Sequence, residues 1–469
     1  MSTEVRSSAP VFHSVLDMVG NTPMLELSKL DTGPCRLFAK LELMNPGGSI
    51  KDRIGLRMIE DAEKDGRLDP NGDPKPTIVE ATAGNTGLAL ALVAGQRGYD
   101  VKVVMPDKMS QEKIQHLRAM GAEVILARSD VQKGDPEYYQ EVAQALADRT
   151  PNSLYINQFS NPSNVGAHHD TTGPEIWEQT GGKVDAFVVG VGSGGTLSGV
   201  GRYLRSKNPG IKLILADPKE SILNPLVNEG KEVEAGSWLI EGMGEDFVPD
   251  ICEIDLCDEA VPVTDAEAFF MAREVLEKEG MLVGSSTGCL VEAAARWCRQ
   301  QTEPLTVVTM LCDSGAKYLS KMFNDYWMID QGFIQREKSG DLRDLIARRH
   351  GTGEDFVLKE DDPVGQAVKR LGMYSVSQMV VMDHKSRVVG IIDEGDILLA
   401  VTGGEDAWQR PVSDYMTRRL ETITPDKPVE ALLPIFRADR VALVVDEKGD
   451  YLGLITKIDL INYLRGRLA

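Results

Sequence analysis

No stretch of this sequence is apolar for long enough to cross a lipid bilayer. The longest apolar run lies around residues 88–94, whereas a membrane-spanning helix needs about 20 such residues. The first ten residues, MSTEVRSSAP, lack the apolar core of a secretory signal. The sequence therefore predicts a protein that stays in the cytoplasm and has no transmembrane segment.

Paired cysteines are missing as well. The six cysteines stand without a CxxC pair and without regular spacing, at positions 35, 252, 257, 289, 298 and 312. A disulfide framework or a structural zinc site would need paired ligands, so we expect reduced thiols. His168 and His169 are adjacent, and neighbouring side chains of a helix point apart, so the sequence predicts no metal site.

Basic residues are too few for a polyanion-binding protein. The chain has 51 Lys and Arg against 72 Asp and Glu, a formal net charge of −21. Nucleic acids and anionic membranes are bound mainly through Lys and Arg, so neither is an expected partner. Small molecules remain the expected ligands.

The length of 469 residues allows about three domain-sized units. Between about Asn21 and Asp330, short β-branched runs such as PTIVEA, DVKVVMP and DAFVVGVG alternate with longer amphipathic stretches. This alternation predicts a mostly parallel α/β sheet that is doubly wound, with helices on both faces. Ligands of such sheets bind at the carboxyl ends of the strands.

The sequence changes character after Trp327. We predict a first domain over 1–335, a linker over 336–350 with one amphipathic helix, and a third segment over 351–469. That last segment contains two similar units, whose GIIDEGD and GLITKID elements begin at Gly390 and Gly453, 63 residues apart. The spacing and the helix-forming stretch before each unit indicate an internal duplication.

Lys51 follows two glycines in NPGGSIKDR. A lysine attacks an aldehyde only as a neutral amine, which burial or nearby positive charge favours. Most lysines are simply solvated, and Lys51 read alone has that interpretation too. Three later loops of small residues favour a covalently held, phosphorylated cofactor: EATAGNTG, GVGSGGT and GSSTG.

The loop GVGSGGT contains GxGxxG and is followed by Asp217 at the end of another predicted strand. This pattern matches a dinucleotide fingerprint, so a nicotinamide oxidoreductase is one interpretation. Consecutive backbone N–H groups at a helix N-terminus would bind a compact terminal phosphate equally well. The third interpretation is a tight strand-to-helix turn that binds no ligand.

Two further loops have a plain and a functional interpretation. Asn85 in GNTG can begin a helix, or its amide can donate to a phenolate oxygen such as the 3′ oxygen of pyridoxal. GSSTG can likewise open a helix, or it can bring the Ser286 hydroxyl to a pyridine nitrogen.

In this order, NPGGSIKDR, GNTG, GSGGT and GSST resemble the motifs of the fold-type II pyridoxal-phosphate enzymes, in the group of cystathionine β-synthases and cysteine synthases. The resemblance implies an α/β fold with doubly wound sheets in two subdomains, and the tail resembles a tandem pair of CBS (Bateman) domains. The resemblance implies that Lys51 binds the cofactor aldehyde, Asn85 meets the ring oxygen and Ser286 the ring nitrogen. It assigns the phosphate to Gly192, Ser193, Gly194, Gly195 and Thr196. It assigns substrate contacts to Thr82, Ala83, Gly84, Thr86, Gln158 and Glu241, the last near the second-substrate site.

The implied reaction is a β-replacement that condenses serine or O-acetylserine with homocysteine to give cystathionine. Sulfide is an alternative acceptor, which would make the protein an O-acetylserine sulfhydrylase. Ala83 and Phe159 stand where close family members often have Ser and Tyr, which leaves both substrates open. The animal enzymes of this group have a haem-binding extension at this end. Only about 20 residues precede GNTP here, so no haem is expected.

In the tail, Thr456 and Asp459 match the hydroxyl and carboxylate that meet a ribose in CBS domains, whereas Asp393 and Asp396 would repel a phosphate. S-adenosylmethionine is thus a better candidate ligand than ATP, and an empty dimerising module is the alternative. The resemblance also implies a homodimer or homotetramer. A non-enzymatic adenosyl-ligand sensor is a further alternative.

Overall fold

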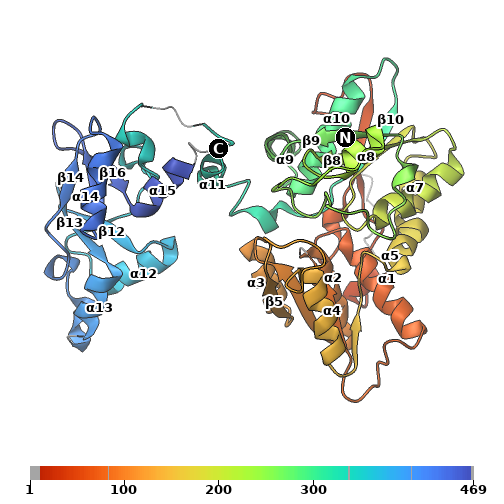
Figure 1. Cartoon of the computed structure of the whole chain (residues 1–469), viewed down its shortest axis with the longest axis horizontal. Coiled ribbons are helices and arrows are strands. Elements are labelled where there is room, and N and C mark those ends of the chain that lie inside the picture. Colours follow the sequence, from red (N-terminus) through yellow and green to blue (C-terminus); the bar gives the residue numbers. More distant parts are fainter. Residues whose placement is uncertain (1–10, 83, 336–338, 403, 466–469) are drawn as a thin grey trace. The chain divides into compact units, whose positions relative to one another are not determined.

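The computed structural model describes residues 11–82, 84–335, 339–402 and 404–465. Ala83, predicted as a substrate contact, lies outside the described residues. The chain divides into two compact units, residues 1–324 and 325–469, and Figure 1 shows the elements of each.

The first unit contains two sheets. Five strands of the larger one run parallel and its edge strand β1 is antiparallel, in the order β1 (Met24–Glu26), β2 (Arg36–Lys40), β10 (Thr306–Met310), β7 (Ala186–Val189), β8 (Lys212–Pro218) and β9 (Glu259–Val263). The smaller one is wholly parallel, in the order β5 (Glu123–Ala127), β4 (Asp100–Pro106), β3 (Thr77–Ala81) and β6 (Ser153–Tyr155). These sheets confirm the predicted α/β class with two subdomains.

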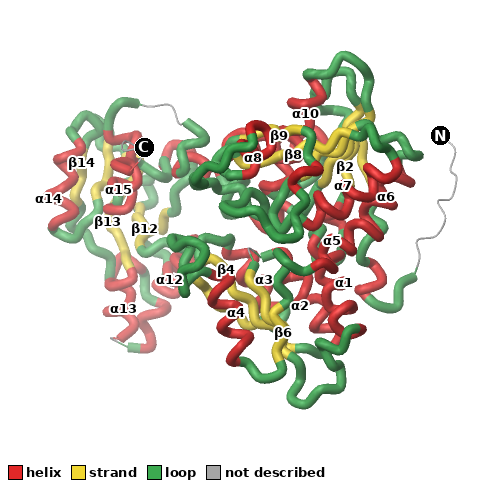
Figure 2. The backbone as a smooth tube through the Cα atoms, turned by 45° about the vertical axis from the view of Figure 1, so that its right-hand side comes forward, coloured by secondary structure: helices red, strands yellow, loops and turns green. Residues whose placement is uncertain are grey.

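Helices connect and cover the parallel strands (Figure 2). Every residue of β3 and of β7 is buried, which explains why both strands read as continuous apolar runs. The helices of this unit are α1 (Lys51–Lys64), α2 (Asn85–Arg97), α3 (Gln111–Ala119), α4 (Tyr139–Arg149), α5 (Pro162–Ala167), α6 (Gly173–Gln179), α7 (Gly195–Lys207), α8 (Leu223–Glu229), α9 (Asp265–Glu279) and α10 (Ser285–Arg299).

Two strand-to-helix turns of the first unit rely on glycine. Gly84, between β3 and α2, has φ +132°, and Gly194, between β7 and α7, has φ +86°. L side chains rarely adopt such angles, so these turns are open to glycine alone without strain. As a result α2 and α7 each begin directly at the carboxyl end of a buried strand.

The second unit repeats one arrangement twice. The first repeat pairs β11 (Val357–Lys359) parallel and β13 (Val388–Asp393) antiparallel to β12 (Gln378–Met382); in the second, β15 (Ala442–Val445) takes the middle position between β14 (Glu421–Ile423) and β16 (Tyr451–Ile455). The register shifts at Val381/Met382 and again at Val444/Val445, 63 residues later. The helices are α11 (Asp325–Asp330), α12 (Val364–Tyr374), α13 (Glu394–Thr402), α14 (Leu432–Arg437) and α15 (Lys457–Arg465).

The segment predicted as a linker contributes to a core. Leu342, Leu345 and Ile346, in and just after a short 3-10 helix (Leu342–Leu345), pack with the buried residues of the second repeat. Gly453 on β16 is needed for this packing, because a Cβ there would lie 2.3 Å from Ile346 Cγ2. Residues 342–346 thus belong structurally to the repeat, while the domain limits at 335 and 350 stay a prediction.

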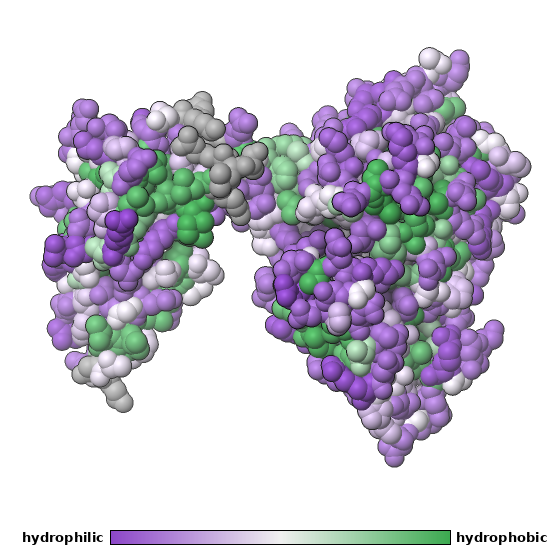
Figure 3. All heavy atoms as spheres, in the orientation of Figure 1, coloured by the Kyte–Doolittle hydropathy of each residue, from purple (hydrophilic) through white to green (hydrophobic). Residues whose placement is uncertain are grey.

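Hydrophilic residues cover most of the surface visible in Figure 3. Among the described residues, no helix combines the length and the apolar character that a membrane crossing requires.

Candidate active site

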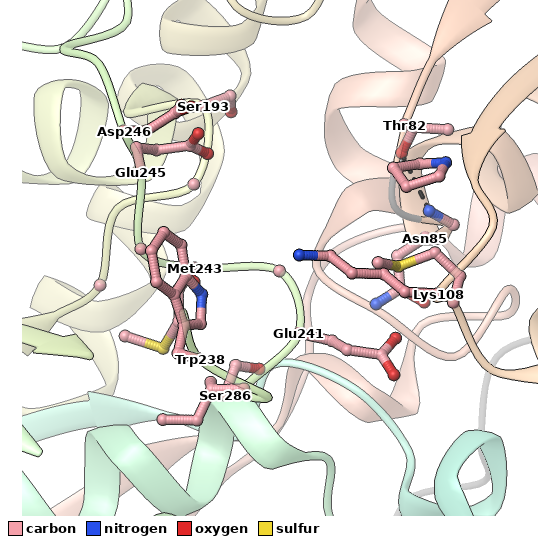
Figure 4. A pocket seen from close by; sticks show the side chains of 18 of the residues that line it. Thr82, Asn85, Lys108, Ser193, Trp238, Glu241, Met243, Glu245, Asp246 and Ser286 are labelled. Carbon is pink, nitrogen blue, oxygen red and sulfur yellow. Dashed lines mark hydrogen bonds between the residues drawn. The ribbon is translucent and has the colours of Figure 1, made fainter. Parts of the chain in front are cut away.

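The first unit holds a cavity of about 910 Å³ (Figure 4). Most of the predicted site residues line it: Lys51, Thr82, Gly84, Asn85, Thr86, Gln158, Gly192, Ser193, Gly194, Thr196, Glu241 and Ser286. Gly195 does not line the cavity but begins α7 beside it. Thr456 and Asp459 belong to the second unit. Residues separated by more than 200 positions therefore share one cavity.

Lys51 is the first residue of α1, and its backbone N–H donates to the Ser49 hydroxyl at 3.2 Å. The preceding turn is held by Asp52, whose Oδ2 accepts from the Gly47 N–H at 2.5 Å. Burial lowers the pKa of the Lys51 amine, because the charged ammonium loses its hydration. The cavity thus contains an amine whose neutral form is favoured.

The turn before α7 packs too tightly for side chains at its glycines. A Cβ on Gly192 would lie 2.6 Å from the Gly242 carbonyl oxygen, and one on Gly195 would lie 1.9 Å from Asn164 Oδ1. Asn164 also donates from Nδ2 to the Ser193 hydroxyl at 2.9 Å. The turn thereby leaves backbone N–H groups at a helix N-terminus, an arrangement that fits a phosphate group.

A buried histidine positions the hydroxyl of this turn. Thr196 Oγ1 lies 3.2 Å from His168 Nε2, and His168 Nδ1 lies 3.0 Å from Thr172 Oγ1. Burial, together with the positive charges of Lys51 and Arg53, lowers the pKa of His168 well below its usual range. His168 is therefore neutral and orients Thr196, a role that the sequence did not indicate.

Asn85 and Ser286 approach the cavity from α2 and α10. Asn85 donates from Nδ2 to Asp313 Oδ2 at 2.7 Å and accepts from Lys317 Nζ at 2.9 Å, so its amide orientation is fixed. Ser286 lies in the first turn of α10 next to the Cys312 thiol. Burial raises the pKa of Cys312 to about 12, so Ser286 and Cys312 offer neutral groups at this wall.

The predicted carboxylate contacts form a hydrogen-bonded group at the start of α2. Thr82 Oγ1 accepts from the Gly84 N–H at 3.1 Å, and Thr86 Oγ1 donates to Gln158 Oε1 at 2.7 Å. The N-terminus of α2 contributes partial positive charge at the same place. This wall suits an anionic group.

Glu241 lines the cavity, and both of its carboxylate oxygens have lysine partners. Its Oε2 accepts from Lys113 at 2.7 Å and its Oε1 from Lys321 at 2.8 Å. Although burial acts in the opposite direction, these two lysines lower the pKa of Glu241. Lys113 also donates to the Tyr318 hydroxyl, which donates to Asp313, so Glu241 is linked through buried hydrogen bonds to the partner of Asn85.

Sequence reasoning missed most of this network. Asp313 and Tyr318 follow the buried strand β10, and polar residues at the carboxyl end of such a strand are a recognisable signal. Lys113 has no such signal, since it lies within an ordinary amphipathic helix.

Asp217, which completed the dinucleotide fingerprint, does not face a ligand. It is buried, and its Oδ2 accepts from the backbone N–H and from Nδ2 of Asn224 at 2.9 and 3.0 Å. Burial raises the pKa of Asp217 to about 6. The carboxylate fixes the start of α8 and is not available to a ribose, which argues against the nicotinamide interpretation.

In the second unit, Thr456 and Asp459 form a pair at the start of α15. Asp459 Oδ2 accepts from the Thr456 backbone N–H at 2.7 Å and from its hydroxyl at 2.5 Å. Asp393 and Asp396 take the equivalent positions at α13, where Asp396 accepts from the Asp393 N–H at 3.3 Å. The helix start of the second repeat therefore has a hydroxyl at Thr456 where the first repeat has the carboxylate of Asp393, and the hydroxyl beside Asp396 comes from Thr417, at 3.4 Å.

Residues 15–313 match the family model described as "Pyridoxal-phosphate dependent enzyme". The chain belongs to this family. Residues 348–403 and 412–466 match the CBS domain model, which confirms the predicted tandem pair. As a member of the family the chain is a pyridoxal-phosphate dependent enzyme of fold type II, and the amine, the phosphate-sized turn and the neutral wall at Ser286 all fit that cofactor.

The relatives carry two names, cystathionine β-synthase and cysteine synthase. The "Cystathionine beta-synthase" of Dictyostelium discoideum is 35% identical over 97% of this chain and 92% of its own length. "Cysteine synthase 1" of Neurospora crassa is 42% identical over 67% of this chain and 84% of its own. The solved structure of the "O-acetylserine dependent cystathionine beta-synthase" of Helicobacter pylori is 38% identical, with a TM-score of 0.61, covering 67% of this chain and 99% of that one.

Proposed function

We propose that this enzyme catalyses a β-replacement in which serine or O-acetylserine combines with homocysteine to give cystathionine. The observation that carries the proposal is the position of Lys51, a buried amine in the same cavity as the phosphate-sized turn and the anion-binding start of α2. Relatives that are named cystathionine β-synthase and align with 97% and 98% of this chain support it.

Bound pyridoxal phosphate would supply an aldehyde and an electron sink for charge at the α-carbon of an amino acid. The phosphate would be held by residues 192–196, the ring oxygen by Asn85 and the ring nitrogen by Ser286. Thr82, Gly84, Thr86 and Gln158 would hold the substrate carboxylate. Lys51, whose pKa is lowered by burial, would accept the α-proton and return it to the leaving group.

The leaving group distinguishes the two donors. Serine loses hydroxide, which must be protonated, whereas O-acetylserine loses acetate, which leaves readily. The Neurospora relative named cysteine synthase supports sulfide as an alternative acceptor, with cysteine as the product. Both donors and both acceptors therefore belong in the test.

The experiment is product analysis by mass spectrometry with serine and O-acetylserine, each combined with homocysteine and with sulfide. We expect cystathionine from at least one donor. Borohydride reduction should leave a pyridoxyl adduct on the peptide that contains Lys51, and Lys51→Ala should abolish both the adduct and the product. Folded, cofactor-supplied protein without that adduct would contradict the proposal.

For the second unit we propose binding of an adenosyl ligand, with S-adenosylmethionine as the first candidate, at Thr456 and Asp459. The hydroxyl and carboxylate suit the two hydroxyls of a ribose, and the uncompensated carboxylates of Asp393 and Asp396 disfavour a polyphosphate. A cytoplasmic location, a homodimer or homotetramer, the absence of haem and the domain limits 1–335, 336–350 and 351–469 are parts of the same proposal.

A further inference from the structure

Glu245 extends into the cavity from the loop that also carries Glu241 (Figure 4). Its side chain makes no hydrogen bond and no ion pair with any described residue, although it is only partly exposed. Burial and the neighbouring Asp246 raise its pKa well above the usual range. A carboxylate at this position is therefore poorly compensated and gains from an incoming cation.

The neighbouring glutamate shows the contrast. Both carboxylate oxygens of Glu241 accept hydrogen bonds from lysines, so that its charge is already neutralised. Lys51 and Lys133 are the two lysines whose positive charge acts on Glu245. Lys133 Nζ lies over the Phe247 ring, 3.7 Å from its centroid, and is not within ion-pair distance of Glu245. Of these two glutamates, Glu245 is the one whose carboxyl group has no cationic partner among the described residues, and a bound ammonium group would favour its charged form.

The proposed function restricts what that cation can be. With the cofactor bound, its aldehyde would engage the nitrogen of the donor amino acid, and the start of α2 would attract the donor carboxylate. Only the second substrate then brings an ammonium group into the cavity. Homocysteine carries one at neutral pH, whereas sulfide carries none.

Resting on the proposed function, we infer that the Glu245 carboxylate binds the ammonium group of an amino-acid thiol and so selects homocysteine over acceptors without an amino group.

The backbone at Glu245 is fixed independently of its side chain. Its N–H donates to the Ser221 hydroxyl at 3.2 Å, and its carbonyl accepts from the Ile222 N–H at 3.2 Å. Gly244, one residue earlier, donates to the Val191 carbonyl at 2.8 Å. Glu245→Gln preserves the shape and should leave the loop in place, which makes it the appropriate variant.

The test compares homocysteine with 4-sulfanylbutanoate, the same thiol acid without its amino group. In the wild-type holoenzyme we expect kcat/KM to favour homocysteine. In Glu245→Gln the ratio of the two kcat/KM values should fall about 10- to 100-fold, mainly through KM of homocysteine. Asp250→Asn, which removes an exposed carboxylate that does not line the cavity, should leave the ratio within about threefold.

The outcomes separate this inference from the proposed function. If wild-type enzyme forms cystathionine but Glu245→Gln keeps the wild-type ratio, or loses activity equally with both thiols while retaining the cofactor absorbance band, the inference is wrong and the proposed function stands. If wild-type enzyme converts sulfide and forms no cystathionine at any homocysteine concentration, the proposed function fails and this inference fails with it.

Discussion

The two units of this chain use charged and polar side chains in opposite ways. In the first unit, buried groups bind one another in a continuous series, from Lys321 and Glu241 to Tyr318 and Asp313. In the second, Thr456 and Asp459 bind each other at the start of α15, and most ion pairs, such as Arg410 with Asp414, are exposed. The polar side chains around the cavity therefore hold one another in place, whereas the second unit has few polar groups whose loss would destabilise its fold.

The largest expected difference concerns Lys51. Lys51→Ala should reduce product formation about a thousandfold or more, because it removes both the covalent attachment and the proton acceptor. Binding of S-adenosylmethionine, measured by calorimetry, should be unaffected if the module acts as a separate site. Lys64→Ala, at the exposed end of the same helix, is the control and should retain activity.

Two buried tyrosines, one with hydrogen-bond partners and one without, test this contrast. Tyr318→Phe leaves Lys113 and Asp313 short of a partner and should lower the free energy of unfolding by about 1–3 kcal/mol. Tyr451→Phe in the second unit should cost nothing or stabilise, since that hydroxyl is buried without a hydrogen-bond partner among the described residues. Urea unfolding followed by circular dichroism measures both, and equal losses would remove the distinction.

The pH dependence of stability offers a third test. Burial would raise the pKa of Glu175, but its ion pairs with Arg53 and Lys40 at 2.7 Å lower it to about 2. The charged carboxylate therefore stabilises the fold above about pH 4.5, and this contribution disappears as the pH falls towards 2.

Glu175→Gln should accordingly cost about 2 kcal/mol at pH 7, after allowing for screening, and the difference from wild type should shrink between pH 5 and pH 3. Asp414→Asn, at the exposed pair in the second unit, should change stability much less. A cost for Glu175→Gln that stays constant down to pH 3 would speak against the ion pairs as its cause.

The smallest expected effect distinguishes the two repeats of the module. Asp459→Asn should weaken S-adenosylmethionine binding about tenfold, because the ribose loses a charged acceptor. Asp396→Asn, at the equivalent position of the first repeat, should leave the affinity unchanged. Isothermal titration of the full chain decides this, and equal weakening by both substitutions would argue that the repeats bind ligand alike.

Much of this architecture could be predicted because its signals are local. Continuous apolar runs gave the buried strands β3 and β7, and glycines at 84 and 194 mark turns that require positive φ. What escaped prediction depends on contacts between distant residues. Glu241 pairs with Lys113, and His168 orients Thr196, although these residues come from segments with no sequence pattern in common. The lack of a partner for Glu245 is likewise not visible in the sequence.

The register shift shared by the two repeats makes their strand pairs comparable position by position. The irregularity falls after Val381 and after Val444, so the two hairpins have the same local backbone. Asp393 and Thr456 therefore occupy matching places on two equivalent frames, and a difference in what the repeats bind would come from their side chains rather than from their backbones.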